Sequence, residues 1–219
     1  MINQKQVDLV LAEFFGTATL ALVVYTILAR TGFPFFTGVV AGATVGIMVY
    51  VLAKFSDAHL NPAVTVGLWS LRKVSTVQAV VHIGAQLLGG LAAWGILEYF
   101  LGRSLTSLAV GDFSWKIFAA EATGGFVLLF GVASAVYQKL NRQQTALVCG
   151  GSLFLGILVA SLASNGIVNP AVALGIQSWS WAYAAAPLAG AVLGANVYGL
   201  MNTPLHLGNA KKSAGRKKK

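Results

Sequence analysis

The sequence predicts an all-α membrane protein with six transmembrane helices and two re-entrant half-helices, arranged as two inverted three-helix repeats. Three observations support this fold class. First, 57% of the 219 residues are hydrophobic and only 10% are charged, whereas soluble domains are about a quarter charged. Second, six apolar segments are long enough to cross a bilayer. Third, features of the first half recur in the second half at the same spacing.

The composition also excludes several classes of protein. A chain this apolar cannot cover a water-exposed surface with polar side chains, which excludes a soluble enzyme, a nucleic-acid-binding domain and a disordered protein. The net charge of +9 does not indicate nucleic acid, because six of the fifteen basic residues lie in the last nine positions. We interpret residues 210–219 as a basic cytoplasmic tail that contacts anionic lipid headgroups. The single cysteine, Cys149, excludes an intrachain disulfide, and we expect no metal and no cofactor.

The expected helices follow from segment length, because a transmembrane helix needs about 20 apolar residues. Two further apolar stretches, Asn61–Ser70 and Asn169–Ser178, have ten residues each. As helices they would be about 15 Å long, half of the hydrocarbon thickness. They are therefore predicted to enter the membrane without crossing it. The six predicted crossings are Val7–Ala29, Phe35–Ala53, Val77–Phe100, Trp115–Tyr137, Thr145–Ser164 and Ser180–Met201.

The connections between these segments predict the orientation. With the N-terminus in the cytoplasm, twelve basic residues lie on the cytoplasmic side and three on the outer side. Cytoplasmic loops of membrane proteins carry the excess of lysine and arginine, so we expect both termini in the cytoplasm of a multi-pass cell-membrane protein. Met1–Gln6 is polar and leads into the first apolar segment without a cleavage-like site, which predicts a retained first helix.

The internal repeat joins the two half-helices to two buried carboxylates. Asn61-Pro62-Ala63 recurs as Asn169-Pro170-Ala171, and Glu13 recurs as Glu121. The glutamate precedes the asparagine by 48 positions in both halves. Because each half contains three crossings, the second copy is inverted in the membrane relative to the first.

The chemistry of Asn-Pro-Ala suits the start of a half-helix. Asparagine is a favoured N-cap, and proline is favoured at the first helical position. Two half-helices that enter from opposite faces bring their positive N-terminal ends together near the midplane. The predicted result is a narrow wet passage that donates hydrogen bonds to neutral solutes and repels cations. Asn-Pro also marks ordinary turns in soluble proteins, but two copies in register favour the pore.

These residues resemble the aquaporin or major intrinsic protein family, and the resemblance covers nearly the whole chain. It implies a homotetramer with one pore per subunit and passive flow in both directions. Residues 1–209 would then form a single transmembrane channel domain, with repeat one at about 7–100 and repeat two at about 115–203. The residues that carry the resemblance are Ala12–Thr17, Ala58–Val66, Ala85-Gln86, Glu121, Asn169-Pro170-Ala171, Pro187 and Gly190-Ala191.

The resemblance also implies a second constriction, a selectivity filter near the outer mouth. Its four positions correspond to Ala41, Ile157, Gly166 and Val172. Val172 stands where most of the family has arginine, so the filter is expected to be wide and apolar. Glycerol, urea, ammonia and small metalloid hydroxides are then candidate solutes. The alternatives are a strictly water-selective aquaporin, another residue in place of the arginine, or a shifted loop.

Three polar residues have both a structural and a functional interpretation. Carboxylates inside membrane helices are functional candidates by default, which makes Glu13 and Glu121 candidates for a proton relay. The resemblance instead implies that each accepts hydrogen bonds from the backbone of the adjacent re-entrant loop, and we favour this interpretation. His59 is interpreted as a polar brace or vestibule residue, with a pH gate as the alternative. No role is assigned to His82, and Cys149 is assigned to packing.

Two other classes of membrane protein compete with a channel. Secondary transporters also contain inverted repeats and broken helices, but they need a midplane ion or proton site, for which only the two glutamates are available. An adhesion protein needs large extramembrane surfaces, yet the longest outer connection, residues 101–114, has fourteen residues. No catalytic spacing is present, so an enzyme is not expected. The sequence predicts a passive channel whose partners are water, small neutral solutes and membrane lipid.

Overall fold

The computed structural model describes residues 4–109 and 113–203, and the predicted tail at 210–219 lies outside these residues. The described part contains helices and loops and no strand. Six of its helices are long and apolar enough to cross a membrane, which confirms the fold class of a multi-pass membrane protein. The helices are α1 (Gln4–Thr31), α2 (Pro34–Leu52), α3 (Pro62–Ser70), α4 (Thr76–Leu101), α5 (Trp115–Tyr137), α6 (Arg142–Ala160), α7 (Pro170–Gly175) and α8 (Trp181–Met201).

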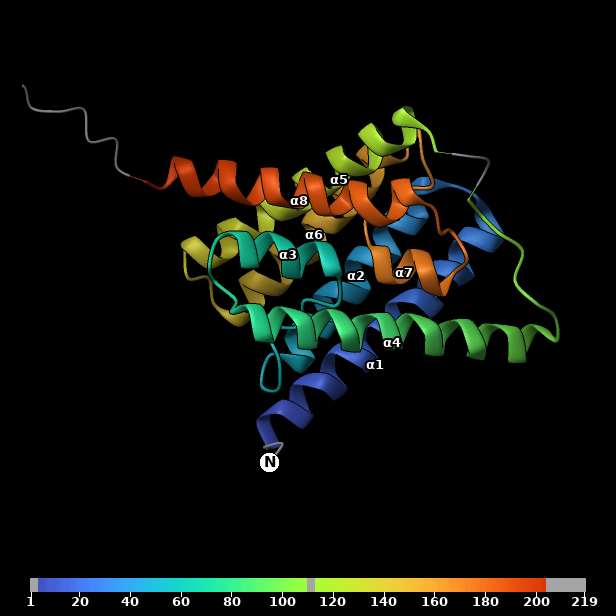
Figure 1. Cartoon of the computed structure of the whole chain (residues 1–219), viewed down its shortest axis with the longest axis horizontal. Helices are drawn as coiled ribbons and strands as arrows, with labels where there is room; N and C mark the ends of the chain where they lie inside the picture. Colours follow the sequence, from blue (N-terminus) through green and yellow to red (C-terminus); the bar gives the residue numbers. More distant parts are fainter. Residues whose placement is uncertain (1–3, 110–112, 204–219) are drawn as a thin grey trace, which may run out of the picture.

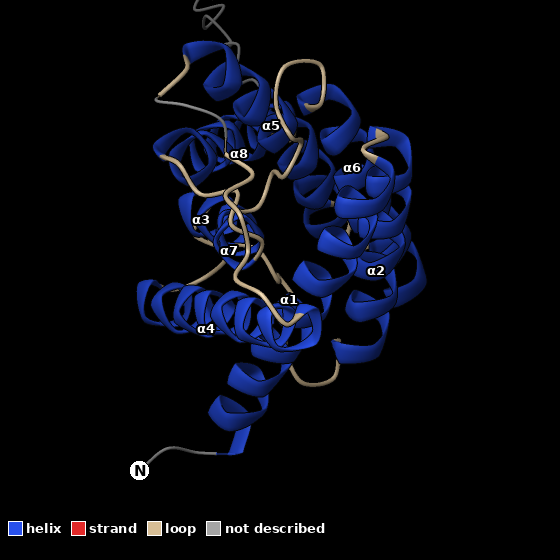
Figure 2. Cartoon of the chain, turned by 90° about the vertical axis from the view of Figure 1, so that its right-hand side faces the viewer, coloured by secondary structure: helices blue, strands red, loops and turns tan. Residues whose placement is uncertain are grey.

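The two short helices lie between two of the long helices. Figure 1 shows α3 and α7 between α4 and α8, and in Figure 2 α2 and α6 lie on the opposite side of the molecule from α3. Helix α3 packs against α4 of its own repeat and against α5 and α8 of the other. Helix α7 packs against α8 of its own repeat and against α1 and α4 of the other. Each half-helix is therefore held by both repeats, in equivalent positions.

Local capping explains where the helix ends differ from the predicted boundaries. A capping box formed by Asn141 and Gln144 starts α6 at Arg142, three residues before the predicted start. Helix α7 is shorter than the predicted ten residues. Gln177 adopts a left-handed φ of 58°, and the backbone N–H of Ser178 donates to the carbonyl of Ala173. This Schellman-type turn ends the helix and redirects the chain.

The close crossing of α2 and α6 joins the two repeats on the side away from α4. A Cβ atom on Gly42 would lie 2.6 Å from the carbonyl oxygen of Gly150, and one on Gly150 would in turn meet the carbonyl oxygen of Gly42. Small residues allow such backbone contact between membrane helices. The crossing positions Ala41 on α2, which is adjacent to Gly42, and Ile157 on α6, about two turns from Gly150.

Candidate functional site

The two half-helices begin at their prolines, as the sequence predicts. Asn61 and Asn169 precede them in an extended conformation, with φ of −158° and −150°. The Oδ1 atom of Asn61 accepts a hydrogen bond from the backbone N–H of Ala63 at 2.8 Å. The Oδ1 atom of Asn169 accepts one from Ala171 at 3.0 Å. Each asparagine therefore caps its helix and has a fixed side-chain orientation.

The two asparagines also join the repeats to each other. Asn61 Nδ2 donates to the carbonyl of Val168 at 2.9 Å, and Asn169 Nδ2 donates to the carbonyl of Leu60 at 2.9 Å. Each carbonyl belongs to the loop that precedes the opposite half-helix. The N-termini of α3 and α7 therefore meet, as expected for half-helices that enter from opposite faces. The second N–H of each amide takes part in neither bond, which leaves it available to a solute.

A cavity of about 390 Å³ leads to this meeting point. Its inner end reaches His59, Asn61 and Asn169. Its other end carries Lys73 and Lys139, which follow α3 and α5 on the side that the charge pattern assigns to the cytoplasm. Most of the wall between these ends is apolar, formed by Leu20, Val45, Val49, Val64, Leu68, Val74, Leu128, Val132, Val136, Leu140, Cys149 and Leu153.

Cys149 packs in the buried core, as the sequence analysis expects, and it also lies on the cavity wall. Its thiol is free and buried. The sequence did not reveal the second position, because core packing and cavity lining both place an apolar face of α6 toward the protein interior.

Glu13 fixes the loop before the first half-helix. This fully buried carboxylate accepts hydrogen bonds from the backbone N–H groups of His59 at 2.9 Å and Leu60 at 2.8 Å. It also accepts one from the hydroxyl of Ser56 at 2.6 Å. Hydrogen bonds to a carboxylate are stronger than those between neutral groups. The contacts agree with the structural role that we favour for this residue.

Glu121 performs the same task in the second repeat. It accepts hydrogen bonds from the backbone N–H groups of Ile167 at 3.0 Å and Val168 at 2.6 Å, and from Ser164 Oγ at 2.7 Å. The serine follows its glutamate by 43 positions in both repeats. Sequence reasoning missed these two serines, although extending the repeat alignment beyond the asparagines would have paired them.

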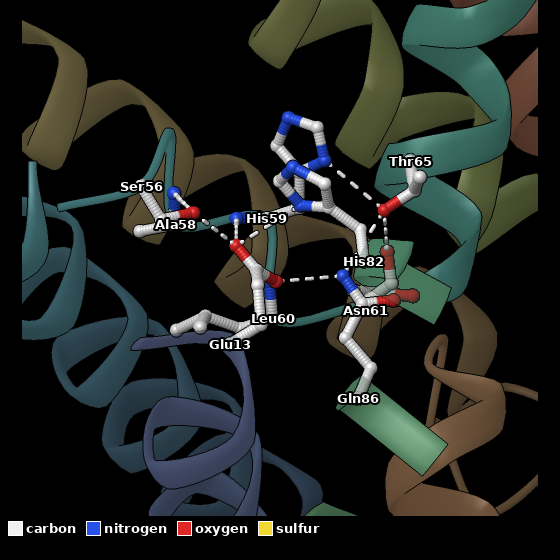
Figure 3. A network of polar contacts seen from close by, with 9 residues as sticks. All are labelled: Glu13, Ser56, Ala58, His59, Leu60, Asn61, Thr65, His82 and Gln86. Carbon is white, nitrogen blue, oxygen red and sulfur yellow. Dashed lines mark hydrogen bonds and ion pairs between the residues drawn. The ribbon is translucent and has the colours of Figure 1, made fainter. Parts of the chain in front are cut away.

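The carboxylate of the first repeat has additional polar neighbours on α4 (Figure 3). Gln86 Nε2 donates to Glu13 at 2.7 Å and to Thr65 at 3.0 Å. His82 Nδ1 lies 3.2 Å from Glu13 Oε1, and the His82 ring stacks on that of His59 with centroids 4.4 Å apart. The sequence analysis assigned no role to His82. The available signal was its spacing from Gln86, because residues four apart share one face of a helix.

The four predicted filter positions come from three helices and one loop, and all are buried. None of them lines the cavity, which ends at the two asparagines. Gly166 has a φ of 63°, and a Cβ atom there would lie 2.8 Å from the carbonyl oxygen of Ile157. The backbone therefore needs glycine at this position. Its small size is explained by packing against α6, so the width of the filter depends on Ala41, Ile157 and Val172.

A polar cluster beside Gly166 fastens the outer connections. The backbone N–H of Asn165 donates to the hydroxyl of Tyr183 at 2.9 Å. Its Nδ2 atom donates to the carbonyl of Leu108 at 2.9 Å and to Ser178 Oγ at 3.0 Å. One side chain thus joins the loop before α7, the turn after it and the connection between α4 and α5. Sequence reasoning missed this residue, because its partners are distant in the chain.

Comparison with known proteins gives the family. The model of the major intrinsic protein family matches residues 3–198. The chain belongs to this family. Aquaporin PIP2-4 of Oryza sativa subsp. japonica is 33% identical over 176 residues, which are 70% of this chain and 62% of that protein. Aquaporin PIP2-4 of Zea mays is 32% identical over 197 residues, which are 79% of this chain and 68% of that protein. The chain spans about three fifths of the length of several such relatives.

A solved structure supports the fold independently of these relatives. The X-ray structure of the aquaglyceroporin from Plasmodium falciparum is 23% identical in sequence and superposes with a TM-score of 0.70. The superposition covers 90% of this chain and 95% of that one. The arrangement of six long helices around two half-helices is therefore the fold of the family.

Proposed function

We propose that the protein is a passive membrane channel for water and small uncharged solutes. One observation carries the proposal: the two cross-paired asparagines cap opposed half-helices, and both line the end of an apolar cavity. A solute that reaches the two asparagines meets N–H donors on an otherwise apolar wall. Such a wall binds water weakly and in few places, which permits rapid passage.

The electrostatics of the meeting point favour neutral solutes. The N-termini of α3 and α7 both direct their positive ends toward it. The nearby carboxylates, Glu13 and Glu121, accept hydrogen bonds from the loop backbone. Their charge is therefore taken up by fixed donors. A cation in the passage would find repulsion and no free anionic partner at this depth.

Because both carboxylates accept hydrogen bonds from the loop backbone, they argue against the alternative function of a secondary transporter. Coupled transport needs an ion or proton site at the midplane. Both oxygens of Glu13 and of Glu121 accept hydrogen bonds from the loops that precede the half-helices. The names of the plant relatives, aquaporins, also favour a water channel over a transporter or an enzyme.

Position 172 holds valine in place of arginine, which favours the passage of solutes other than water. Arginine would supply a full positive charge and several donors, whereas Val172 is apolar and 1% exposed. Ala41 is small and Ile157 is apolar. We infer that the filter admits solutes less polar than water, with glycerol, urea, ammonia and small metalloid hydroxides as candidates. A strictly water-selective pore is the alternative.

The resemblance to the family supports the remaining proposals. We infer that residues 1–209 form one channel domain of two inverted repeats, at about 7–100 and 115–203. We further infer a homotetramer in the cell membrane with both termini in the cytoplasm. Chemical cross-linking in native membranes tests the homotetramer. Protease accessibility of residues 210–219 in sealed vesicles tests the location of the C-terminus.

Stopped-flow light scattering of proteoliposomes tests the solute class. Vesicles receive an impermeant osmolyte step for water flow, and then a glycerol step for solute entry. We expect fast shrinkage, followed by fast re-swelling in glycerol. Val172→Arg is expected to slow glycerol entry about tenfold, which corresponds to about 1.4 kcal/mol. Val172→Met is the matched control, because it has similar length without charge and should slow glycerol entry much less.

Two results would change this proposal. Shrinkage without glycerol re-swelling in the wild type indicates the strictly water-selective alternative. Equal glycerol entry in the wild type and in Val172→Arg shows that residue 172 does not face the passage, as a shifted loop would predict.

A further inference from the structure

The cavity that ends at the asparagine pair has the size and the wall of a site for an apolar ligand. Its volume of about 390 Å³ lies within the range of roughly 300–1,000 Å³ that small-molecule sites occupy. Between the two ends of the cavity, the wall is formed mostly by leucine and valine side chains. Apolar cavities hold water poorly and accept apolar molecules. The cavity therefore suits an occupant that is less polar than the solutes that pass through it.

Two helices give the length of this wall. Along α5 the wall runs from Leu128 to Val136, and along α6 it runs from Thr145 to Leu153. Each run covers eight helical steps, which is about 12 Å. An extended alkyl chain advances by about 1.25 Å per carbon, because its bonds are about 1.5 Å long and meet at about 111°. A straight chain of about ten carbons therefore matches the length of the wall.

The open end of the cavity is positively charged. Lys73 and Lys139 line this end, and both are exposed. The ammonium group of Lys73 lies 4.8 Å from the centroid of the Tyr137 ring, which is a cation–π contact. Because Tyr137 is the last residue of α5 and Lys139 lies two positions later, this contact brings both lysines to the same end of α5. An anionic group at the mouth would meet two cations while it remains in water.

The acidic residue of the mouth lies on another segment. Among the described residues that line the cavity, Asp57 is the one acid. It belongs to the connection between α2 and α3, and the residue before it, Ser56, donates to Glu13 on α1. This connection is therefore fastened to α1, whereas the two lysines gather at the end of α5. The charged residues of the mouth, two lysines and one aspartate, sum to +1, so the mouth favours an anion.

An anion with an apolar tail suits this cavity in one orientation. Its headgroup stays in water beside the lysines, because an ionised carboxylate is strongly destabilised in an apolar interior. Its tail lies along the leucine and valine side chains and ends near Asn61 and Asn169, which line the inner end. The tail then occupies the passage in front of the asparagine N–H donors. Water can no longer reach the two asparagines from this side.

We propose that the cavity binds a straight-chain carboxylate of about ten carbons, with its headgroup at Lys73 and Lys139, and that the bound chain blocks water flow. The block rests on the proposed channel function, whereas the binding does not. Removal of the tail from water supplies most of the affinity, at about fourfold per methylene group. The lysines act in water, where an ion pair contributes little. They therefore select the charge of the headgroup and change the affinity only a few-fold.

Binding of radiolabelled fatty acids to proteoliposomes at pH 7.5 tests the site without reference to flow. Binding to empty liposomes is measured in parallel and subtracted. We expect saturable binding whose dissociation constant falls about fourfold for each carbon added from hexanoate to decanoate. Dodecanoate should bind at most about twofold tighter than decanoate, because its last carbons extend beyond the 12 Å wall of about eight helical steps. Partition into the bilayer, in contrast, continues to rise with chain length.

A ligand of opposite charge and a pair of lysine variants test the mouth. Decyltrimethylammonium has the same tail and a positive headgroup, and it should bind about fivefold more weakly than decanoate. Lys73→Gln/Lys139→Gln should weaken decanoate binding about fourfold and remove the preference for the anion. Lys5→Gln/Lys54→Gln is the matched control, because it removes two exposed charges that do not line the cavity. It should bind both ligands like the wild type.

Water flow through the same proteoliposomes separates this inference from the proposed function. Decanoate should lower the flow over the concentration range in which it binds. No flow above that of empty liposomes without fatty acid refutes the channel, and the binding data then still decide the site. Binding that rises through dodecanoate as it does in lipid, or that is equal in Lys73→Gln/Lys139→Gln, refutes the site. Saturable binding that leaves the flow unchanged refutes the block. Equal elution and thermal unfolding of the variants establish that they are folded.

Discussion

Replacing each buried glutamate by glutamine separates a structural role from a proton relay. In Glu121→Gln, one carboxylate oxygen becomes an NH₂ group. The Oε2 atom accepts from Val168 alone, while Oε1 accepts from Ser164 and Ile167. The amide oxygen therefore keeps two donors satisfied, whereas the Val168 N–H loses its acceptor and faces the new NH₂ group, which is itself a donor. The expected cost is about 3 kcal/mol, from the donors left facing each other and the weakening of two charge-assisted bonds.

The same change in the first repeat is expected to cost more. Each oxygen of Glu13 serves two donors: Oε1 accepts from Ser56 and His59, and Oε2 from Leu60 and Gln86. Whichever oxygen becomes NH₂, two donors lose their partner. Glu13→Gln should therefore destabilise the protein by about 5 kcal/mol.

Unfolding free energies in mixed detergent micelles, together with proton flux in proteoliposomes, measure both effects. Asp8→Asn is the matched control on α1, because the Asp8 carboxylate accepts an exposed hydrogen bond from the Gln4 side chain, and it should change stability by less than about 0.5 kcal/mol. We expect the loss of unfolding free energy to be largest for Glu13→Gln, smaller for Glu121→Gln and smallest for Asp8→Asn. The proton flux of each folded channel should be unchanged. A Glu13→Gln protein that is as stable as the wild type but differs in proton flux would refute the reasoning and favour a relay.

Three further predictions follow from the cavity, the helix crossing and the outer loops. A methanethiosulfonate reagent with a quaternary ammonium group should lower water flow about fivefold by attaching a charge at Cys149, and Cys149→Ser should be resistant. Gly42→Val should cost about 2–4 kcal/mol in detergent unfolding or prevent folding, because its side chain meets the backbone of Gly150. Asn165→Ala loses its two side-chain hydrogen bonds and should lower the unfolding free energy by about 2 kcal/mol.

The parts of the fold that the sequence predicts are those with local or periodic signals. The half-helix starts were predictable because Asn61-Pro62 and Asn169-Pro170 carry both the cap and the first helical residue within two positions. The crossings were predictable because membrane helices need a minimum apolar length. The equal spacing of Glu13 and Glu121 from the motifs indicated that the two carboxylates have equivalent contacts, which the hydrogen bonds show.

The parts that could not be predicted depend on tertiary contacts. The apposition of His82 to Glu13 brings α4 to α1, and no local pattern encodes it. Asn165 likewise finds partners on three separate segments. Gly166 was interpreted as a small filter residue, but its backbone conformation and the nearby end of α6 already require glycine. A sequence alone does not distinguish a residue that is small to leave room for the solute from one that is small because the backbone conformation requires it.

Osmotic water flow in proteoliposomes tests the central claim, that solutes pass where the two half-helices meet. The comparison is between the wild type and the double variant Asn61→Asp/Asn169→Asp, whose carboxylates still cap both helices but can no longer donate to the loop carbonyls. We predict that the wild type shrinks faster than empty liposomes in proportion to its content, and that the folded double variant conducts much less. Equal flow through both proteins would contradict a pore at the asparagine pair, and no flow through the wild type would contradict a water channel.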